Sequence, residues 1–159
     1  MSEQQAILEQ GVMDEDALYA GVQALRAVGL DSTVPRLAIW HVIAQSDRPL
    51  GAVEIKRRLI RRSFHLAIST IYTVLRRLQD VSLISTCTIA GKSHYYLSSR
   101  HFHHRFVCTE SGDEYWLDDT EITQAIETLC RKHGFELGDY TLSVKGRLLQ
   151  ESALALEHG

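Results

Sequence analysis

The stretch Ala67-Ile68-Ser69-Thr70-Ile71-Tyr72-Thr73-Val74-Leu75-Arg76-Arg77-Leu78-Gln79 decides the fold of the first half of this chain. Its apolar residues recur at helical spacing, so one face of a helix would carry Ile68, Ile71, Leu75 and Leu78. The opposite face would carry Ser69, Thr73 and Arg76, with Tyr72 on the flank. Small hydroxyl side chains let a helix approach DNA closely, arginine reaches guanine edges or phosphates, and a tyrosine ring contacts thymine methyl groups. The stretch therefore predicts a helix suited to the major groove.

The segments around this helix favour a winged helix. Apolar periodicity predicts earlier helices over 16–28, 33–46 and 52–62; Gly29 would end the first, and Pro35 would lie in the first turn of the second. Two β-rich runs follow, 83–89 and 93–97, joined by a turn that contains Gly91 and has Lys92 near its tip. Three helices followed by a hairpin with a basic tip are typical of a winged helix, although a small α+β lobe without a ligand would share this pattern.

The charge of the chain is divided between its two halves. The formal net charge is −3, yet residues 48–100 carry ten basic residues against only Glu54 and Asp80. From His101 onward, five basic residues face eleven acidic ones. The split indicates a first half that meets a polyanion. The four arginines Arg57, Arg58, Arg61 and Arg62 alone could equally be a solvated helix face.

The second half predicts a small α/β domain. Strands are expected over 103–108, 114–117 and 140–144, with helices from about 118 to 133 and from 147 to 156. Three strands and two helices make a thin core for one chain. We therefore expect this half to pair with a copy of itself.

Composition excludes several other classes. The chain has 159 residues, 45% of them hydrophobic, with no apolar run near the roughly 20 residues of a membrane helix and no basic, apolar leader. Its three cysteines are odd in number and form no C-x-x-C pair, which argues against a disulfide framework. No nucleophile elbow, phosphate-binding glycine loop or H-E-x-x-H motif supports an enzyme. These features predict a cytoplasmic, non-enzymatic protein with no membrane partner.

Several motifs of this chain resemble those of the ferric uptake regulator family. The resemblance runs in order from about Leu18 to Gly146 and rests on these stretches: Leu25-Arg26-Ala27-Val28-Gly29-Leu30-Asp31-Ser32-Thr33-Val34-Pro35-Arg36-Leu37, Ser69-Thr70-Ile71-Tyr72-Thr73-Val74-Leu75-Arg76-Arg77-Leu78, Gly91-Lys92-Ser93, the histidine-rich run before Cys108, and Lys132-His133-Gly134-Phe135-Glu136-Leu137. It implies an α+β fold, with an N-terminal winged helix-turn-helix domain followed by a small α/β dimerisation domain. It also implies a homodimeric transcriptional regulator of the repressor type that responds to a divalent metal, iron or zinc, and binds a palindromic operator.

The residue patterns and the family resemblance together give the expected domain organisation and DNA contacts. The DNA-binding domain is expected over 1–98, with an N-terminal extension over 1–14, a hinge over 99–102, and the dimerisation domain over 103–159. Tyr72 matches the family's base-contacting tyrosine and Arg36 its positional arginine, whereas Asp31 and Thr73 stand where the family often has basic residues. The expected DNA contacts are Arg36, Arg57, Arg61, Ser69, Thr70, Tyr72, Thr73, Arg76 and Lys92.

The metal-ligand positions depart from the family pattern. Two positions of the regulatory site read Pro49 and Tyr96, and Arg105 occupies a third, so His103 alone falls on a ligand of that site. In the second site, the expected Glu and His read Thr123 and Tyr140, another His reads Phe102, and His104 stands where the family has Asp. Ser111 and Leu148 interrupt the two C-x-x-C pairs of the structural zinc site, which we expect to be absent.

Several hypotheses about the metal remain open from the sequence. Imidazoles of His101, His103 and His104, with His94 nearby in the chain, could hold one divalent ion, zinc or iron, together with Cys87 or Cys108. In a strand, His101 and His103 would share one face and His104 the other. Alternatively, Arg105 supplies the positive charge of the metal and DNA binding is metal-independent. Heme binding by the histidine-rich run, and a protein-interaction module that kept only the fold, are further alternatives.

Overall fold

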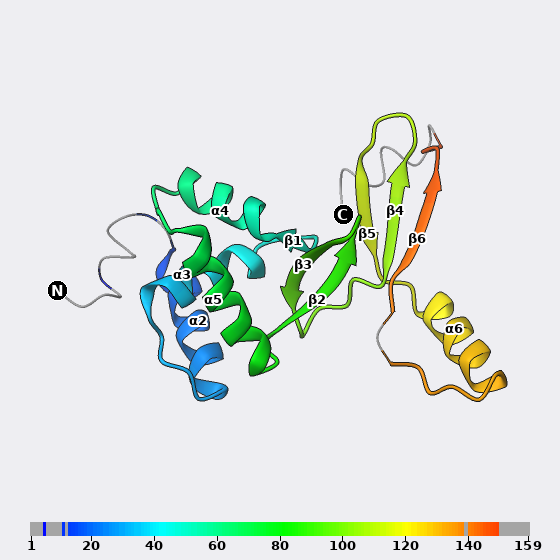
Figure 1. The fold of residues 1–159 in the computed structure, drawn as a ribbon, viewed down its shortest axis with the longest axis horizontal. Coiled ribbons are helices and arrows are strands. Elements are labelled where there is room, and N and C mark those ends of the chain that lie inside the picture. Colours follow the sequence, from blue (N-terminus) through cyan, green and yellow to red (C-terminus); the bar gives the residue numbers. More distant parts are fainter. Residues whose placement is uncertain (1–4, 6–10, 12, 139, 150–159) are drawn as a thin grey trace. The chain divides into compact units, whose positions relative to one another are not determined.

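The computed structural model describes residues 5, 11, 13–138 and 140–149 of the chain. It divides into two units, Met1–Arg100 and His101–Gly159, each described by itself below (Figure 1). Of the expected N-terminal extension, Met13 is buried in the core of the first unit and Asp14 caps its first labelled helix, so these two residues belong to the folded unit.

Over residues 13–100 the first unit is built from the helices α2 (Glu15–Ala27), α3 (Val34–Ala44), α4 (Ala52–Arg61) and α5 (Ile68–Asp80). The Asp14 carboxylate accepts the Ala17 N–H at 2.7 Å and begins α2. Gly29 ends it as predicted, with φ +72° and the Leu30 N–H donating to the Leu25 carbonyl. Helix α3 begins after Thr33, whose side chain makes no capping hydrogen bond.

The core of the first unit lies where the apolar faces of these helices meet. The largest side chains with under 2% exposure include Leu25, Leu37, Ile39, Ile55, Leu59, Ile71, Leu75, Leu78 and Ile84. Each buried side chain of this size stabilises the fold by roughly 1.5–3 kcal/mol relative to exposure. On α5 the fourth buried position is Val74 rather than the predicted Ile68, which is half-buried at the first turn.

A three-stranded antiparallel sheet completes this unit in the order β1-β3-β2. It contains β1 (Leu50–Gly51), β2 (Ile84–Ile89) and β3 (Lys92–Leu97). Ala90 and Gly91 form the predicted turn, with φ +49° and +74°, between the paired residues Ile89 and Lys92. The sequence did not predict β1, because two residues are too short to show a period. The predicted winged helix is confirmed.

The described part of the second unit contains one sheet and one helix. Its strands are β4 (His104–Cys108), β5 (Glu114–Leu117) and β6 (Leu142–Gly146), in the order β5-β4-β6, with β5 antiparallel and β6 parallel to β4. Helix α6 (Thr120–Lys132) begins at Asp119, whose carboxylate accepts the Ile122 N–H at 3.0 Å. The mixed α+β class is therefore confirmed.

Two predictions for this unit were wrong in detail. Strand β6 begins at Leu142, two residues later than expected, because its parallel pairing with β4 starts at the pair His104 and Leu142. Residues 147–149 are not helical, so the helix expected over 147–156 does not begin at Arg147; its remaining positions lie outside the described residues.

Candidate nucleic-acid interface and histidine cluster

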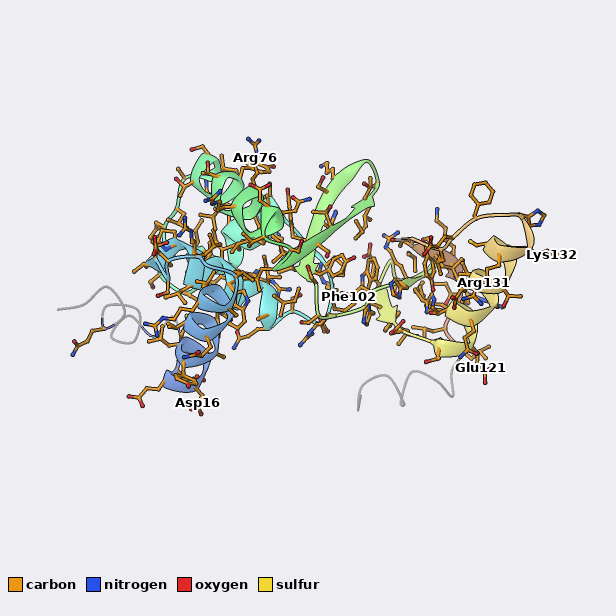
Figure 2. All side chains as sticks on the ribbon, turned by 90° about the horizontal axis from the view of Figure 1, so that it is seen from below. Asp16, Arg76, Phe102, Glu121, Arg131 and Lys132 are labelled. Carbon is orange, nitrogen blue, oxygen red and sulfur yellow. The ribbon has the colours of Figure 1, made fainter. Side chains whose placement is uncertain are left out.

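The outer face of α5 is polar and exposed. Ser69, Tyr72, Thr73 and Arg76 are exposed, Tyr72 at 50%, and Thr70 is half-buried. Arg76 projects outward from the helical body in Figure 2. The Thr73 hydroxyl donates to the Ser69 carbonyl at 2.9 Å, so this hydroxyl is already used within the helix. The face is free to meet a partner through the Tyr72 ring and the Arg76 guanidinium.

A cleft of about 560 Å³ lies between α4, α5 and β3. It brings together three of the predicted DNA contacts from three separate elements: Arg57, Tyr72 and Lys92. Glu54 and His94 also line it, and sequence reasoning did not assign either to this surface. The His94 Nδ1 lies 3.0 Å from the Lys92 carbonyl, so Nδ1–H donates and Nε2 keeps its lone pair.

The charges around α4 are only partly balanced. Glu54 accepts hydrogen bonds from Arg48 at 2.6 Å and from Arg58 at 3.1 Å. Burial alone would raise the pKa of Glu54, but the hydrogen bonds and charges of the two arginines outweigh it and lower that pKa. Within the described residues, no ion pair engages four of the predicted contacts: Arg57, Arg61, Arg76 and Lys92. These cations remain available to phosphates.

Arg36 is one of the predicted contacts that do not line this cleft, and it lies on α3. It is half-buried in the first turn of α3, and its Nη1 donates to the Asp31 carbonyl at 3.0 Å. The guanidinium thereby closes the turn that leads into α3. This contact gives Arg36 a structural task whether or not it also meets DNA.

The histidines of the second unit are engaged by protein groups. His104 is fully buried, with Nδ1 accepting the Asp119 N–H at 3.0 Å and Nε2 lying 2.9 Å from the Tyr140 hydroxyl. His103 Nδ1 lies 3.3 Å from the Asp118 carboxylate, and its ring stacks on Tyr140 with centroids 4.8 Å apart. The ring of His101 stacks on that of His103 at 5.3 Å. As expected, His101 and His103 lie together, although β4 begins only at His104.

The three predicted ligands do not form a common metal site in this structure. Both ring nitrogens of His104 are used, and a metal ion needs a free nitrogen lone pair. Across the described residues, no three side chains of histidine, cysteine, aspartate or glutamate are grouped to hold an ion. The donor set of His101, His103 and His104 therefore does not fit a metal within one chain.

Arg105 and Cys108, which occupy two other metal-ligand positions of the family pattern, both interact with protein groups. Arg105 pairs with Glu114 on β5, so its charge is balanced inside the sheet and does not support the hypothesis that it replaces a metal ion. Cys108 is buried, and its pKa is lowered to about 7 because the Ser111 hydroxyl and the backbone N–H groups of Ser111, Leu148 and Glu110 hydrogen-bond to the sulfur.

Comparison with known proteins decides the family. The model of the ferric uptake regulator family matches residues 27–145, which include both units and the cleft. The chain belongs to the ferric uptake regulator family. Members of the ferric uptake regulator family are DNA-binding, metal-responsive transcription repressors and not enzymes.

Individual relatives agree over most of the chain. The chain is 31% identical over 127 residues to the ferric uptake regulation protein of Vibrio cholerae serotype O1 (strain O395), covering 79% of this chain and 85% of that protein. It is 28% identical over 137 residues to that of Escherichia coli K12, covering 85% and 93%. The crystal structure of the Vibrio cholerae regulator superposes with a TM-score of 0.65 at 29% identity, covering 80% of this chain and 98% of that one.

Proposed function

We propose that this protein is a sequence-specific DNA-binding transcriptional repressor. The cleft that joins Tyr72 on α5, Arg57 on α4 and Lys92 on the wing carries this proposal. It combines an exposed aromatic ring, which distinguishes bases, with cations that have no partner among the described residues and can neutralise phosphates. Such a protein would act in the cytoplasm on chromosomal DNA.

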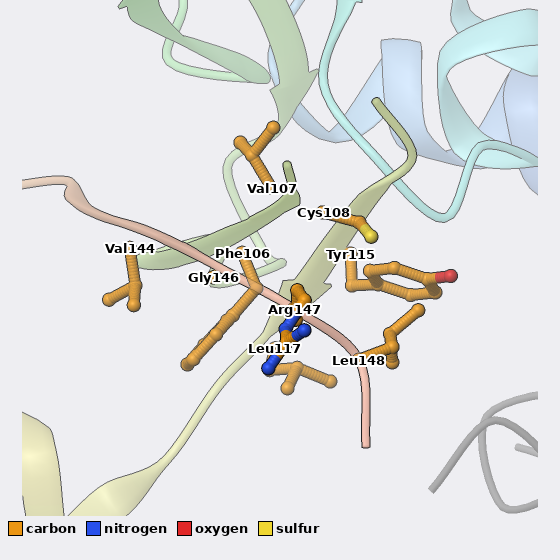
Figure 3. Close-up of a pocket in the computed structure, with 9 residues that line it drawn as sticks. All are labelled: Phe106, Val107, Cys108, Tyr115, Leu117, Val144, Gly146, Arg147 and Leu148. Atoms are coloured by element: carbon orange, nitrogen blue, oxygen red, sulfur yellow. The ribbon is translucent and has the colours of Figure 1, made fainter. Parts of the chain in front are cut away.

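A homodimer is the second part of the proposal. Within the described part of the second unit, only His104 and Cys108 are buried, and no residue of α6 is. Leu117, Leu129, Phe135 and Val144 are exposed by 37–68%. Figure 3 shows a hollow of about 270 Å³ on the sheet, lined largely by apolar side chains such as Phe106, Leu117 and Val144. A second copy would cover this surface, and its two-fold symmetry would match a palindromic operator.

Helix α6 supports this assembly, and no helix in the described ranges is long and apolar enough to span a membrane. Arg131 and Lys132 lie at the end of α6 in Figure 2, while its apolar side carries Ile122 and Ile126. The helix is therefore amphipathic, and none of its residues is buried by the described part of the chain, as expected for a dimer interface.

A response to a divalent metal, iron or zinc, is the second candidate. Membership in a family of metal-responsive repressors and the stacked pair His101 and His103 support it. Two imidazoles are fewer than the three or four protein ligands typical of zinc sites, so a metal at this pair would need a ligand from elsewhere. The metal content of protein purified without chelator tests this candidate: less than one equivalent per chain, with operator binding unchanged by chelators, would reject it.

Operator binding is tested on DNA from upstream of the protein's own gene. Retardation of that DNA, with footprint protection of a palindrome, is expected for the wild type. Tyr72→Ala should weaken specific binding by about 1–3 kcal/mol and non-specific binding less. Tyr19→Ala is the control, because Tyr19 is 68% exposed on α2 and does not line the cleft. If Tyr72→Ala binds as the wild type does, α5 is not the recognition helix; if no DNA is retarded, a protein-interaction module is favoured.

A further inference from the structure

Four hydrogen bonds in the second unit form a closed ring that begins and ends at Asp119. The Asp119 N–H lies 3.0 Å from His104 Nδ1, and His104 Nε2 lies 2.9 Å from the Tyr140 hydroxyl. The Tyr140 hydroxyl lies 2.9 Å from Thr123 Oγ1, which in turn lies 3.0 Å from the Asp119 carbonyl. The ring joins strand β4, the first turn of α6 and the segment before β6.

Only one arrangement of protons satisfies every member of this ring. A backbone N–H can only donate, so His104 Nδ1 must accept and Nε2 must carry the proton. Nε2–H then donates to the Tyr140 oxygen, the Tyr140 hydroxyl donates to Thr123, and the Thr123 hydroxyl donates to the Asp119 carbonyl. Each donor has one acceptor, as a buried polar group requires. The neutral Nε2–H tautomer of His104 is therefore part of the fold.

The members of this ring stand at positions where the family resemblance implies a metal. The second family site would place its ligands at Phe102, His104, Thr123 and Tyr140, and the structure links the last three directly. Neutral threonine and tyrosine hydroxyls are not among the usual ligands of zinc, which are cysteine, histidine and carboxylate side chains. An ion bound at either ring nitrogen of His104 would leave the Asp119 N–H without its acceptor, because Nδ1 would then carry the ion or the ring proton.

We propose that this hydrogen-bonded ring takes over the joining role of the second metal site, so that the second unit keeps its fold without a divalent ion at this position. The His103 ring stacks on the face of the Tyr140 ring with an interplanar angle of 10°, which adds a second contact to Tyr140 beside its hydroxyl bonds. The fold needs a neutral network here, and any metal response must come from other residues. The inference rests on hydrogen bonds within one unit and not on operator binding.

The first experiment compares the full-length protein with and without ions. Thermal unfolding is measured after exhaustive treatment with EDTA, and again with one to three equivalents of zinc or manganese. NMR of the His104 ring is recorded in each sample. We expect His104 to remain the Nε2–H tautomer in every sample. We also expect the EDTA-treated protein to unfold at the same temperature as the untreated protein. Loss of the His104 Nε2 proton on zinc addition would overturn the proposal, and so would an unfolding temperature that falls with EDTA and recovers with one equivalent of ion while the His104 ring signals change in step.

Matched variants assign the effect to the ring. Tyr140→Phe keeps the stacked ring but removes the hydroxyl, and should lower the unfolding temperature by several degrees whether or not EDTA is present. Tyr19→Phe removes a hydroxyl from an exposed tyrosine on α2 and should leave it unchanged. Equal unfolding temperatures for Tyr140→Phe and the wild type would contradict the proposal.

A restoring variant gives an independent readout. The combination Phe102→His, His104→Asp, Thr123→Glu and Tyr140→His replaces the ring by family donor types, and should gain one equivalent of zinc by direct metal analysis over the wild type. Equal zinc content of the two proteins would count against the proposal. Because none of these measurements uses DNA, a failure of operator binding remains separately visible.

Discussion

The guanidinium of Arg48, two residues before β1, lies 2.6 Å from the carboxylate of Glu54 in the first turn of α4. The same carboxylate oxygen accepts from Arg58 one turn further along the helix. Glu54 thereby ties the first turn of α4, and with it one wall of the cleft, to the segment before β1. The acidic side chain of α4 therefore makes a structural contact at the wall of the cleft.

Loss of this carboxylate is predicted to destabilise the first unit. Glu54→Gln removes one charge shared by two half-buried arginines, and the free energy of unfolding should fall by about 1 kcal/mol. Glu127→Gln breaks the exposed pair with Arg131 on α6 and should change stability by less than half as much. Urea unfolding of the two variants measures both values. A larger loss for Glu127→Gln would show that the two-arginine contact does not anchor α4.

The cations of the cleft are predicted to set the salt dependence of DNA binding. Arg57→Gln and Lys92→Gln should each reduce the slope of log affinity against log salt concentration by about 1, because each releases about one counterion fewer. Arg131→Gln on α6 serves as the control, since Arg131 is paired with Glu127 in the other unit. Fluorescence anisotropy at several salt concentrations measures the slopes. Identical slopes for the wild type and both cleft variants would show that the DNA phosphates do not contact Arg57 or Lys92.

Acid is predicted to weaken the first unit through His41. Burial, and then the charge of Arg62, lower the pKa of this 4%-exposed histidine below its usual 6.5, although Asp14 opposes the effect. The unfolded chain therefore binds the proton more readily, and stability falls as the pH drops below about 6.5. His41→Gln should show a smaller loss of urea midpoint between pH 7.5 and 5.5 than the wild type. His65→Gln, at an exposed position, should follow the wild type.

The comparison of His41→Gln with His65→Gln can contradict this prediction. If His41→Gln and His65→Gln lose the same midpoint on acidification, the acid sensitivity does not come from the buried imidazole.

The apolar face of the second unit is predicted to hold a dimer. Leu129→Glu on α6, where Leu129 is 57% exposed, puts a charge into the proposed interface and should raise the dimer dissociation constant at least about tenfold, or ~1.4 kcal/mol. Tyr19→Glu adds the same charge to an exposed residue of α2 and should leave the dimer intact. Analytical ultracentrifugation measures both. A wild type that sediments as a monomer would refute the dimer.

Periodicity predicted the helical elements well and the short or paired elements poorly. Helices α2 to α6 begin and end within a few residues of their predicted limits, because an amphipathic helix shows its buried face in the sequence. The strand β1 has two residues, and the start of β6 depends on where it pairs with β4. Neither property is local, so no window of sequence contains it.

The candidate site was likewise predictable from the sequence only where its residues belong to a single element. The polar face of α5 could be predicted from spacing alone, but the cleft could not, because Arg57, Tyr72 and Lys92 come from three elements. Glu54 and His94 were missed for the same reason. For the histidine-rich run, the sequence could not distinguish metal ligands from core residues. A histidine that binds an ion and a histidine whose two ring nitrogens are hydrogen-bonded to the protein are identical in the sequence.

The sequence by itself determined the family, the winged helix and the charge that suits DNA, because these depend on local periodicity and on residue types in order. Only the tertiary structure decided that the residues at the family's second metal site are hydrogen-bonded to one another. His104, Thr123 and Tyr140 lie up to 36 residues apart, and they act together only because the parallel pairing of β4 with β6 brings Tyr140 over the start of α6. Hydrogen bonds form over about 3 Å, a distance that chain order does not encode.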